Sequence, residues 1–471
     1  MAESPPHVLL VSFPSQGHIN PALQLAKRLV HAAVQVTFAT TLSAHKHVSK
    51  PQNTLPGLSF VGFSDGYDKA FSLGVNLDIY MSVFKHHGMK NLKQVILNIN
   101  NDKELRPITR VFYCNLIPWV ALVARELHIP STLLWNQAAA VLDIYYYSFH
   151  GYEDFIRDNI VNEDSFSLRL PGLPQLSSHD LPPYFLPSHV HEFALPTWRA
   201  HFEILDEETT KPIVLVNTFD ALETEALKSI ENYTLIGVGP LIPSAFLDGK
   251  DPSDNSLRGD LFKSSESKNY TDWLNLKSLS SVIYVSFGSL SVLDKPQMEE
   301  VARALISTGR PFLWVNRENQ KGEGKQEEEL SCRGELEKQG MIVPWCFQVE
   351  VLSHPSIGCF VTHCGWNSTF ESLASGVPVV AFPQWTDQMP NAKMVEDVWK
   401  TGVRVMKNEA EGLVEADEIE RCLELVMGSN ERGEKMRRNA KKWKDLAREA
   451  SMEGGSSDKN LKTFVHEVLR G

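Results

Sequence analysis

Short, continuously apolar runs alternate with helical segments along this chain, and they do so in two separate halves. The first run is 7–13 (HVLLVSF), and a second run, 34–40, follows one helical segment later. Runs that are apolar at nearly every position are typical of parallel strands with both faces buried. Because parallel strands need a crossover between them, the pattern predicts right-handed βαβ units. We therefore expect a doubly wound α/β fold.

The second half of the chain repeats this pattern without obvious sequence identity to the first. The run 281–289 (SVIYVSFGS) is followed by a helical segment and then by PFLWV. A chain of 471 residues is too long for one compact core, so two large domains are expected. After Val238 the periodicity is lost and Gly, Pro, Asp and Ser accumulate, which indicates a linker. We expect domains over residues 1–245 and 266–455, joined by a linker over 246–265.

The charge balance and the start of the chain exclude several classes of protein. Lys and Arg number 46 against 58 Asp and Glu, so the net charge of −12 argues against a general nucleic-acid binder. No apolar run is long enough to span a bilayer, and MAESPPH lacks the basic start and apolar middle of a secretory signal. We expect a cytosolic protein that binds no nucleic acid and has no membrane span.

The six cysteines form no CxxC pair. Cys359 and Cys364 lie near His354 and His363, but an apolar strand separates them and the paired spacing of a zinc site is missing. Reduced thiols packed as small hydrophobic groups are the favoured interpretation. No metal ligands are predicted, and no DxD metal motif stands out.

The segment 345–388 combines a strand–turn–helix pattern with several polar and aromatic residues. Its centre, FVTHCGWNSTFE, predicts a buried strand (357–362), a tight turn through Gly365 and a helix that opens near Asn367 and Ser368. Backbone N–H groups and the positive end of the helix dipole then converge on one spot, which suits a phosphate group.

A purely structural interpretation exists for part of this segment. Ser368, followed three residues later by Glu371, is also the pattern of a capping box, and for this pair alone capping is favoured. A cap does not require Trp345, Gln348, His363, Trp366, Asp387 and Gln388 at their spacings. The segment as a whole therefore favours the binding of a nucleotide sugar.

Residues 345–388 resemble, almost position by position, the signature box of plant secondary-metabolite UDP-glycosyltransferases. The similarity covers nearly the whole chain. Segments such as YYYSFHGYED and GPLIPSAFLDGKDPS resemble the branch of anthocyanin 5-O-glucosyltransferases and enzymes that form crocetin glucosyl esters. The resemblance implies the GT-B fold, in which two Rossmann-like domains face a cleft and a last helix, here 456–471, packs back on the first domain.

The resemblance also implies roles for the donor residues. Trp345 would stack on uracil, the Cys346 backbone would meet the base edge, and Gln348 and Glu371 would bind ribose. The phosphates would be bound by Ser289, His363, Asn367 and Ser368. Trp366, Asp387 and Gln388 would face the sugar, and a glutamine at position 388 resembles glucose users. UDP-glucose would be a co-substrate, with no cofactor.

His18 is the candidate general base. It follows the first strand in a loop with Gly17, ahead of a helix that Pro21 is expected to open. The motif GHINP (17–21) matches the loop that holds the base in the family. Members commonly carry an aspartate that orients this base, whereas here Cys114 stands in YCNLIPW (113–119).

Three explanations for Cys114 remain open. In the first, Asn115 substitutes for the aspartate. In the second, catalysis on weakly acidic hydroxyls is poor. In the third, the acceptor needs little deprotonation, as is the case for a carboxylic acid, which is already ionised. The candidate acceptor residues are Gln16, Asn136, Gln137, Tyr145 and Trp385. For these residues and for the proline-rich stretch 170–188, core packing is at least as good an interpretation as acceptor binding.

The expected activity is an inverting, metal-independent transfer of glucose from UDP-glucose to a hydroxyl or a carboxylate of a small plant metabolite. The protein is expected to act as a monomer. Two alternatives are a nucleotide-sugar-binding protein without transferase activity and a UDP-sugar epimerase.

Overall fold

The computed structural model divides into two compact units, residues 1–261 with 449–471 and residues 262–448. The residues that the structure describes are 5–49, 55–68, 76–161, 166–252, 254, 269–289, 291, 293–316, 330–408 and 412–470.

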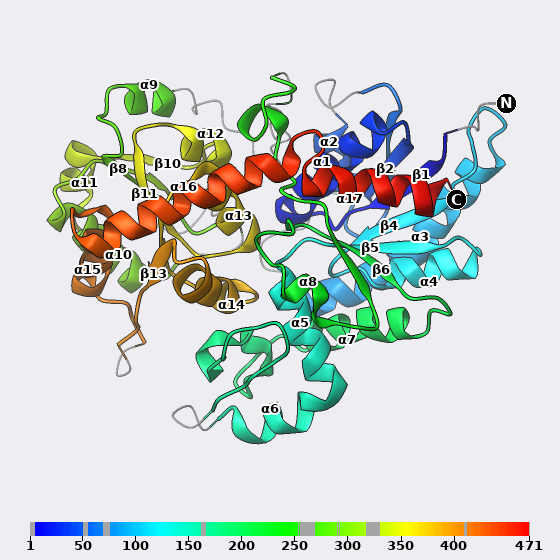
Figure 1. Cartoon of the computed structure of the whole chain (residues 1–471), viewed down its shortest axis with the longest axis horizontal. Coiled ribbons are helices and arrows are strands. Elements are labelled where there is room, and N and C mark those ends of the chain that lie inside the picture. The colour runs from blue at the N-terminus through cyan, green and yellow to red at the C-terminus, as the bar shows by residue number, and fades with distance from the viewer. Residues whose placement is uncertain are drawn as a thin grey trace. The chain divides into compact units, whose positions relative to one another are not determined.

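The described part of the first unit is built on a seven-stranded parallel sheet in the order β3-β2-β1-β4-β5-β6-β7 (Figure 1). Val8 of β1 pairs with Val36 of β2 on one side and with Arg110 of β4 on the other. The chain thus leaves β1 in one direction and later returns to its other side. The strands are β1 (His7–Val11), β2 (Gln35–Thr41), β3 (Leu58–Phe63), β4 (Arg110–Cys114), β5 (Ser131–Trp135), β6 (Ile213–Val216) and β7 (Thr234–Gly237).

Helices cover this sheet, and the final segment of the chain is one of them. Leu461 and Phe464 of α17 are buried in the same core as Leu25 of α1 and Leu10 of β1, and the side chain of Arg470 donates to the Ala32 carbonyl at 2.9 Å. The helices are α1 (Gln16–His31), α2 (Leu42–Val48), α3 (Leu77–Asn101), α4 (Trp119–Glu126), α5 (Ala139–Tyr147), α6 (Glu153–Asn159), α7 (Ala194–Asp206), α8 (Ala226–Ser229) and α17 (Ser456–Phe464).

Six parallel strands in the order β10-β9-β8-β11-β12-β13 form the sheet of the second unit, as far as it is described (Figure 1). They are β8 (Val282–Ser286), β9 (Phe312–Val315), β10 (Met341–Val343), β11 (Ile357–Thr362), β12 (Val379–Ala381) and β13 (Gly402–Arg404). Its helices are α9 (Asn269–Asn275), α10 (Lys295–Ser307), α11 (Arg333–Gln339), α12 (Gln348–Ser353), α13 (Trp366–Ser375), α14 (Gln388–Lys393), α15 (Ala416–Met427) and α16 (Glu431–Ser451).

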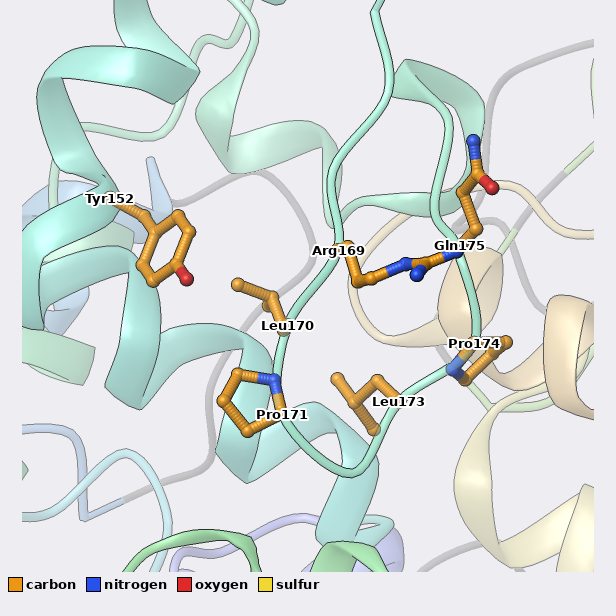
Figure 2. Close-up of a pocket in the computed structure, with 7 residues that line it drawn as sticks. All are labelled: Tyr152, Arg169, Leu170, Pro171, Leu173, Pro174 and Gln175. Carbon is orange, nitrogen blue, oxygen red and sulfur yellow. The ribbon is translucent and has the colours of Figure 1, made fainter.

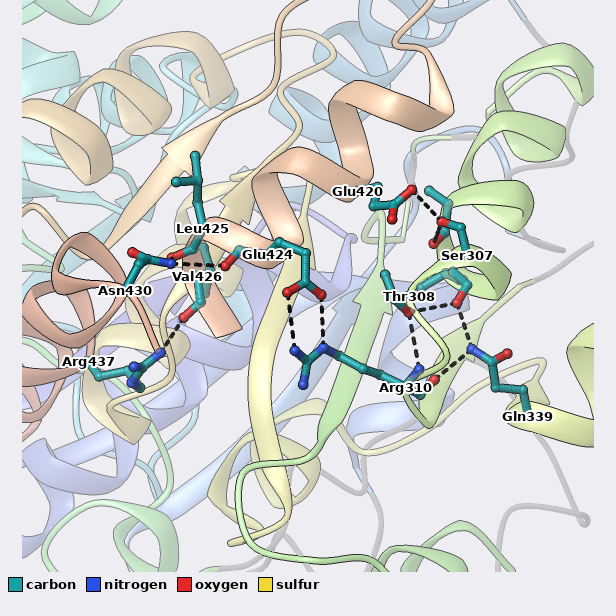
Figure 3. A network of polar contacts seen from close by, with 12 residues as sticks. Ser307, Thr308, Arg310, Gln339, Glu420, Glu424, Leu425, Val426, Asn430 and Arg437 are labelled. Atoms are coloured by element: carbon teal, nitrogen blue, oxygen red, sulfur yellow. Dashed lines mark hydrogen bonds and ion pairs between the residues drawn. The ribbon is translucent and has the colours of Figure 1, made fainter. Parts of the chain in front are cut away.

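A polar network joins the ends of the helices on this second sheet (Figure 3). The guanidinium of Arg310 donates to both carboxylate oxygens of Glu424 at 3.2 and 3.3 Å, and Gln339 donates to the carbonyls of Leu305 and Arg310. Ser307 donates to Glu420 at 2.7 Å. Because these charged groups are partly exposed, each contact contributes little to the stability of the fold.

The described part of the predicted linker 246–265, which is residues 246–252 and 254, belongs to the first unit. Leu247 is 1% exposed, and Lys27 Nζ contacts Asp254 Oδ1 at 2.6 Å. Residues 253 and 255–265 lie outside the described residues. Within the described ranges the predicted fold class is confirmed, because each unit contains a doubly wound parallel sheet.

Candidate functional site

The predicted donor residues follow the carboxyl ends of strands in the second sheet. The chain runs from β8 to β9 and β10, and then crosses to the other side of β8 to form β11. The switch point of such a sheet therefore lies between the ends of β8 and β11, where ligands of doubly wound folds bind. Ser289 follows β8, and His363 follows β11 directly.

Two glycines make room for His363 at this switch point. A Cβ atom at Gly288 or at Gly365 would collide with the imidazole of His363, and Gly288 has a φ of +77°, which favours glycine. The ring therefore lies against both loop backbones. This arrangement brings the loop after β8 and the loop after β11 together around one side chain.

Helix α13 begins at Trp366, and its N-cap is Gly365, which has no side chain to donate or accept a cap hydrogen bond. The capping-box interpretation of Ser368 and Glu371 is therefore wrong, because Ser368 lies inside the first turn. The backbone N–H groups of this turn, with Asn367 and Ser368 beside them, form the positive end of a ten-residue helix.

Ser368 and Glu371 instead belong to a network centred on Gln348. Gln348 Nε2 donates to Ser368 Oγ at 2.9 Å and to Glu371 Oε2 at 2.7 Å, while its Oε1 accepts from the Tyr284 hydroxyl at 3.3 Å. Burial raises the pKa of Glu371 to about 7, against the opposing effect of the Gln348 hydrogen bond. This carboxyl group therefore changes its charge near neutral pH.

The loop after β12 holds Asp387 and Gln388 in fixed orientations. Asp387 accepts from the Thr386 hydroxyl and from Asn391 Nδ2, both at 2.8 Å. Gln388 Oε1 accepts the backbone N–H groups of Gln384 and Trp385 at 2.8 and 3.0 Å. Since its oxygen is bound in this way, the Gln388 amide offers its N–H donors to a ligand, beside a carboxylate that accepts.

The aromatic residues of the site differ in accessibility. Trp345 is half-buried, and Cys346 is buried beside the Tyr284 hydroxyl. The Trp366 indole is 3% exposed and packs on Phe370. The backbone N–H of Trp366 reaches Asp387. The expected place of Trp366 beside a sugar stays a prediction.

His18 lies at the corresponding place in the first unit, next to the switch point between β1 and β4. Helix α1 begins at Gln16, so His18 is in its first turn and Pro21 is inside the helix. The prediction that Pro21 opens the helix is wrong, because Ser15 already accepts the backbone N–H groups of His18 and Ile19.

The imidazole of His18 is neutral and packs edge-on against the Phe13 ring. Burial lowers its pKa to about 4, and among the described residues Nδ1 is buried without a hydrogen-bond partner. Burial raises the pKa of the Cys114 thiol to about 12, so the thiol is uncharged as well. Asn115 does not substitute for an aspartate here, because its side chain pairs with Gln137 and with the backbone of Asn136.

The candidate acceptor residues belong to both units. Asn136 is 4% exposed, and Tyr145 is fully buried and stacks on Trp198. Gln16 and Gln137 are half-buried in the first unit, while Trp385 is in the second unit and donates to Ser291. Packing explains Tyr145 better than acceptor binding does.

The first part of the proline-rich stretch 170–188 lines an open pocket of about 560 Å³ (Figure 2). None of the candidate acceptor residues lines it. Its lining residues are Tyr152, Arg169, Leu170, Pro171, Leu173, Pro174 and Gln175.

Sequence reasoning missed two residues that the structure places at the site. Tyr284 is a strand residue inside an apolar run, and Asn391 is inside a short helix, so neither stands out in the sequence. The described ranges contain no group of three or more His, Cys, Asp or Glu side chains that could hold a metal ion. All six cysteines are free. None of the helices in these ranges has the length and apolar character that crossing a membrane requires.

Comparisons with known proteins agree with this geometry. The family model described as UDP-glucoronosyl and UDP-glucosyl transferase matches residues 260–443. The chain is 58% identical to crocetin glucosyltransferase, chloroplastic, of Gardenia jasminoides, over 99% of this chain and 98% of that protein. It is 53% identical to anthocyanidin 3-O-glucoside 5-O-glucosyltransferase of Verbena hybrida, over 98% and 99%. The crystal structure of Os79 from O. sativa in complex with UDP has a TM-score of 0.85 at 32% identity, covering 98% of this chain and 99% of that one.

Proposed function

Because the chain belongs to the UDP-glucoronosyl and UDP-glucosyl transferase family, we propose that it transfers glucose from UDP-glucose to an oxygen of a small plant metabolite, either a phenolic hydroxyl or a carboxylate. The observation that supports this most is the convergence of donor-type residues at the switch point of the second sheet. Relatives named for crocetin, a carboxylic acid, and for an anthocyanidin glucoside, a phenol, support both acceptor classes.

Each part of UDP-glucose has a matching group in this proposal. Trp345 stacks on uracil beside the Cys346 backbone, and Gln348 and Glu371 bind ribose. The first turn of α13, with Ser289, His363, Asn367 and Ser368, binds the diphosphate. Asp387 accepts from hexose hydroxyls and Gln388 donates to them, so a sugar that mismatches this pair leaves buried polar groups unpaired.

The reaction is a direct displacement. The acceptor oxygen forms a bond to the anomeric carbon as the bond from that carbon to the UDP oxygen breaks, and the configuration inverts. The electron pair leaves on the diphosphate, whose charge is stabilised by donors already aimed at it. A hydroxyl proton goes to His18, whereas a carboxylate has none to give. No metal is required in this scheme.

The state of His18 favours acidic acceptors. A base with a pKa of about 4 takes a proton from a phenol, with a pKa near 10, at a large free-energy cost. Without a carboxylate partner at Nδ1, the resulting imidazolium is also not stabilised. A carboxylic acid is already ionised at neutral pH and avoids both costs.

The test is an assay of UDP release with UDP-glucose and a panel of plant phenols and acids. The His18→Ala variant is expected to lose transfer to phenols, to keep transfer to carboxylates, and to bind UDP-glucose as the wild type does. Retained phenol transfer would remove His18 from its role. Turnover with no acceptor in the panel would favour a non-catalytic nucleotide-sugar binder, and conversion of the donor alone would indicate an epimerase.

Two further expectations belong to this proposal. The enzyme acts as a monomer, which sedimentation velocity can check. It works in the cytosol, although one relative's name places that protein in the chloroplast, so localisation of a fluorescent fusion decides between the two.

A further inference from the structure

Asn391 lies between the turn that precedes α13 and the Asp387 carboxylate. It is fully buried, and it lies one turn after Asp387 in α14. Its Nδ2 donates to the Cys364 carbonyl at 2.9 Å and to Asp387 Oδ2 at 2.8 Å. One amide therefore joins the turn that precedes α13 to the carboxylate assigned to the sugar.

The orientation of this amide is unambiguous. Both partners of Nδ2 are oxygens that only accept, so exchanging the amide oxygen and nitrogen would place oxygen against oxygen. This orientation has a free-energy cost, because Asn391 Oδ1 is buried and has no hydrogen-bond partner among the described residues. An unpaired buried carbonyl is destabilising, so stability alone does not account for an asparagine here.

The turn that Asn391 contacts is itself held in an unusual conformation. Cys364 has a φ of +63°, which is uncommon outside glycine, and its carbonyl directly precedes the N-cap of α13. The Trp366 N–H, at the start of the same helix, also acts on the Asp387 carboxylate. Asp387 is thus fixed to the phosphate-binding turn at two points, one of them through Asn391.

We infer that Asn391 is a positioning residue that sets the place of the Asp387 carboxylate relative to the diphosphate site and so determines which sugar the enzyme accepts. This inference rests on the proposed function. Asn391 does not contact the donor; it acts through Asp387. Its loss should therefore weaken recognition of the hexose while recognition of UDP remains.

The test uses Asn391→Leu, which keeps a similar volume and removes both N–H donors. Calorimetry measures the affinities for UDP and for UDP-glucose, and rate assays compare UDP-glucose with UDP-galactose. Loss of a hydrogen bond to a charged group predicts that the affinity of UDP-glucose relative to UDP falls roughly tenfold, and that the preference for glucose falls with it. The affinity for UDP itself should change by less than about twofold.

A matched control separates positioning from general destabilisation. Gln297 is a buried amide of the same unit that donates to and accepts from the Val414 backbone, away from the donor residues. Gln297→Leu should lower the melting temperature without changing the UDP-glucose to UDP affinity ratio. An unchanged ratio in Asn391→Leu, or an equal change in Gln297→Leu, would overturn the inference.

Asn391→Asp provides a second test that does not depend on the folding of the leucine variant. An ionised aspartate repels Asp387, whereas a protonated one donates a single hydrogen bond, so sugar selectivity should recover as the pH is lowered. A pH-independent selectivity would contradict the positioning role. If the wild type binds UDP-glucose but shows no turnover, the proposed function fails while the affinity ratio still tests Asn391.

Discussion

The charge of Glu371 gives the sharpest prediction about the donor site. Its carboxyl group accepts from Gln348 at 2.7 Å, and burial raises its pKa to about 7. A carboxylate that binds ribose hydroxyls accepts their hydrogen bonds best when it is ionised. We therefore expect UDP-glucose to bind more tightly as the pH rises from 6 to 8, and Glu371→Gln to remove this dependence.

The size of the effect follows from the pKa. A group with a pKa of about 7 is about 9% ionised at pH 6 and about 91% ionised at pH 8, so the affinity should rise by up to about tenfold, or about 1.4 kcal/mol. The same shift affects stability with the opposite sign. Because the folded state binds this proton more tightly than the unfolded chain, the stabilisation is complete below pH 4.5 and is lost as the pH rises through about 7.

Calorimetry with UDP-glucose at pH 6, 7 and 8 measures the affinity. UDP is unsuitable because its terminal phosphate titrates near pH 6, like other phosphate monoesters. His18, with a pKa of about 4, stays neutral over this range. Glu223→Gln is the control, because Glu223 is a buried glutamate that binds the start of α5 in the first unit. Equal affinities at pH 6 and pH 8 in the wild type, or the same slope in Glu371→Gln, would refute the reasoning.

Two further predictions concern the first unit. Cys114→Asp should raise the rate with phenols relative to the rate with carboxylates by about tenfold or more, since a carboxylate stabilises the imidazolium of His18. The control Cys114→Asn should leave this ratio unchanged. An equal gain on both acceptor classes would count against the prediction. Asp143 is fully buried, and burial raises the pKa of its carboxyl group against the opposing effect of the Ser229 side chain, so the folded state holds this proton to a higher pH than the unfolded chain does. The melting temperature of Asp143→Asn, relative to that of the wild type, should therefore increase as the pH rises from 5 to 8. A difference in melting temperature that stays constant over this range would show that this proton plays no part.

The fold could be predicted where strands are long and apolar throughout. Runs such as HVLLVSF and SVIYVSFGS correspond to β1 and β8 because burial on both faces of a parallel sheet leaves little room for polar residues. The strands β3, β10 and β12 were not predicted, and two of them, β10 and β12, have only three residues each in which to show a period. The start of α1 was misplaced because a proline usually marks the first turn of a helix, whereas Pro21 is tolerated inside it.

The sequence alone determined most of the candidate donor residues, because 345–388 is one continuous segment whose spacing can be read directly. Only the tertiary structure decided how these residues are held. Tyr284 and Gln348 are hydrogen-bonded although they are 64 positions apart in the sequence, and Asn391 and Cys364 are hydrogen-bonded although they are 27 positions apart. It also decided that Nδ1 of His18 has no partner among the described residues. Hydrogen bonds of this kind depend on which strand ends the sheet order places side by side, and that order is set by the packing of the whole domain and not by any local pattern.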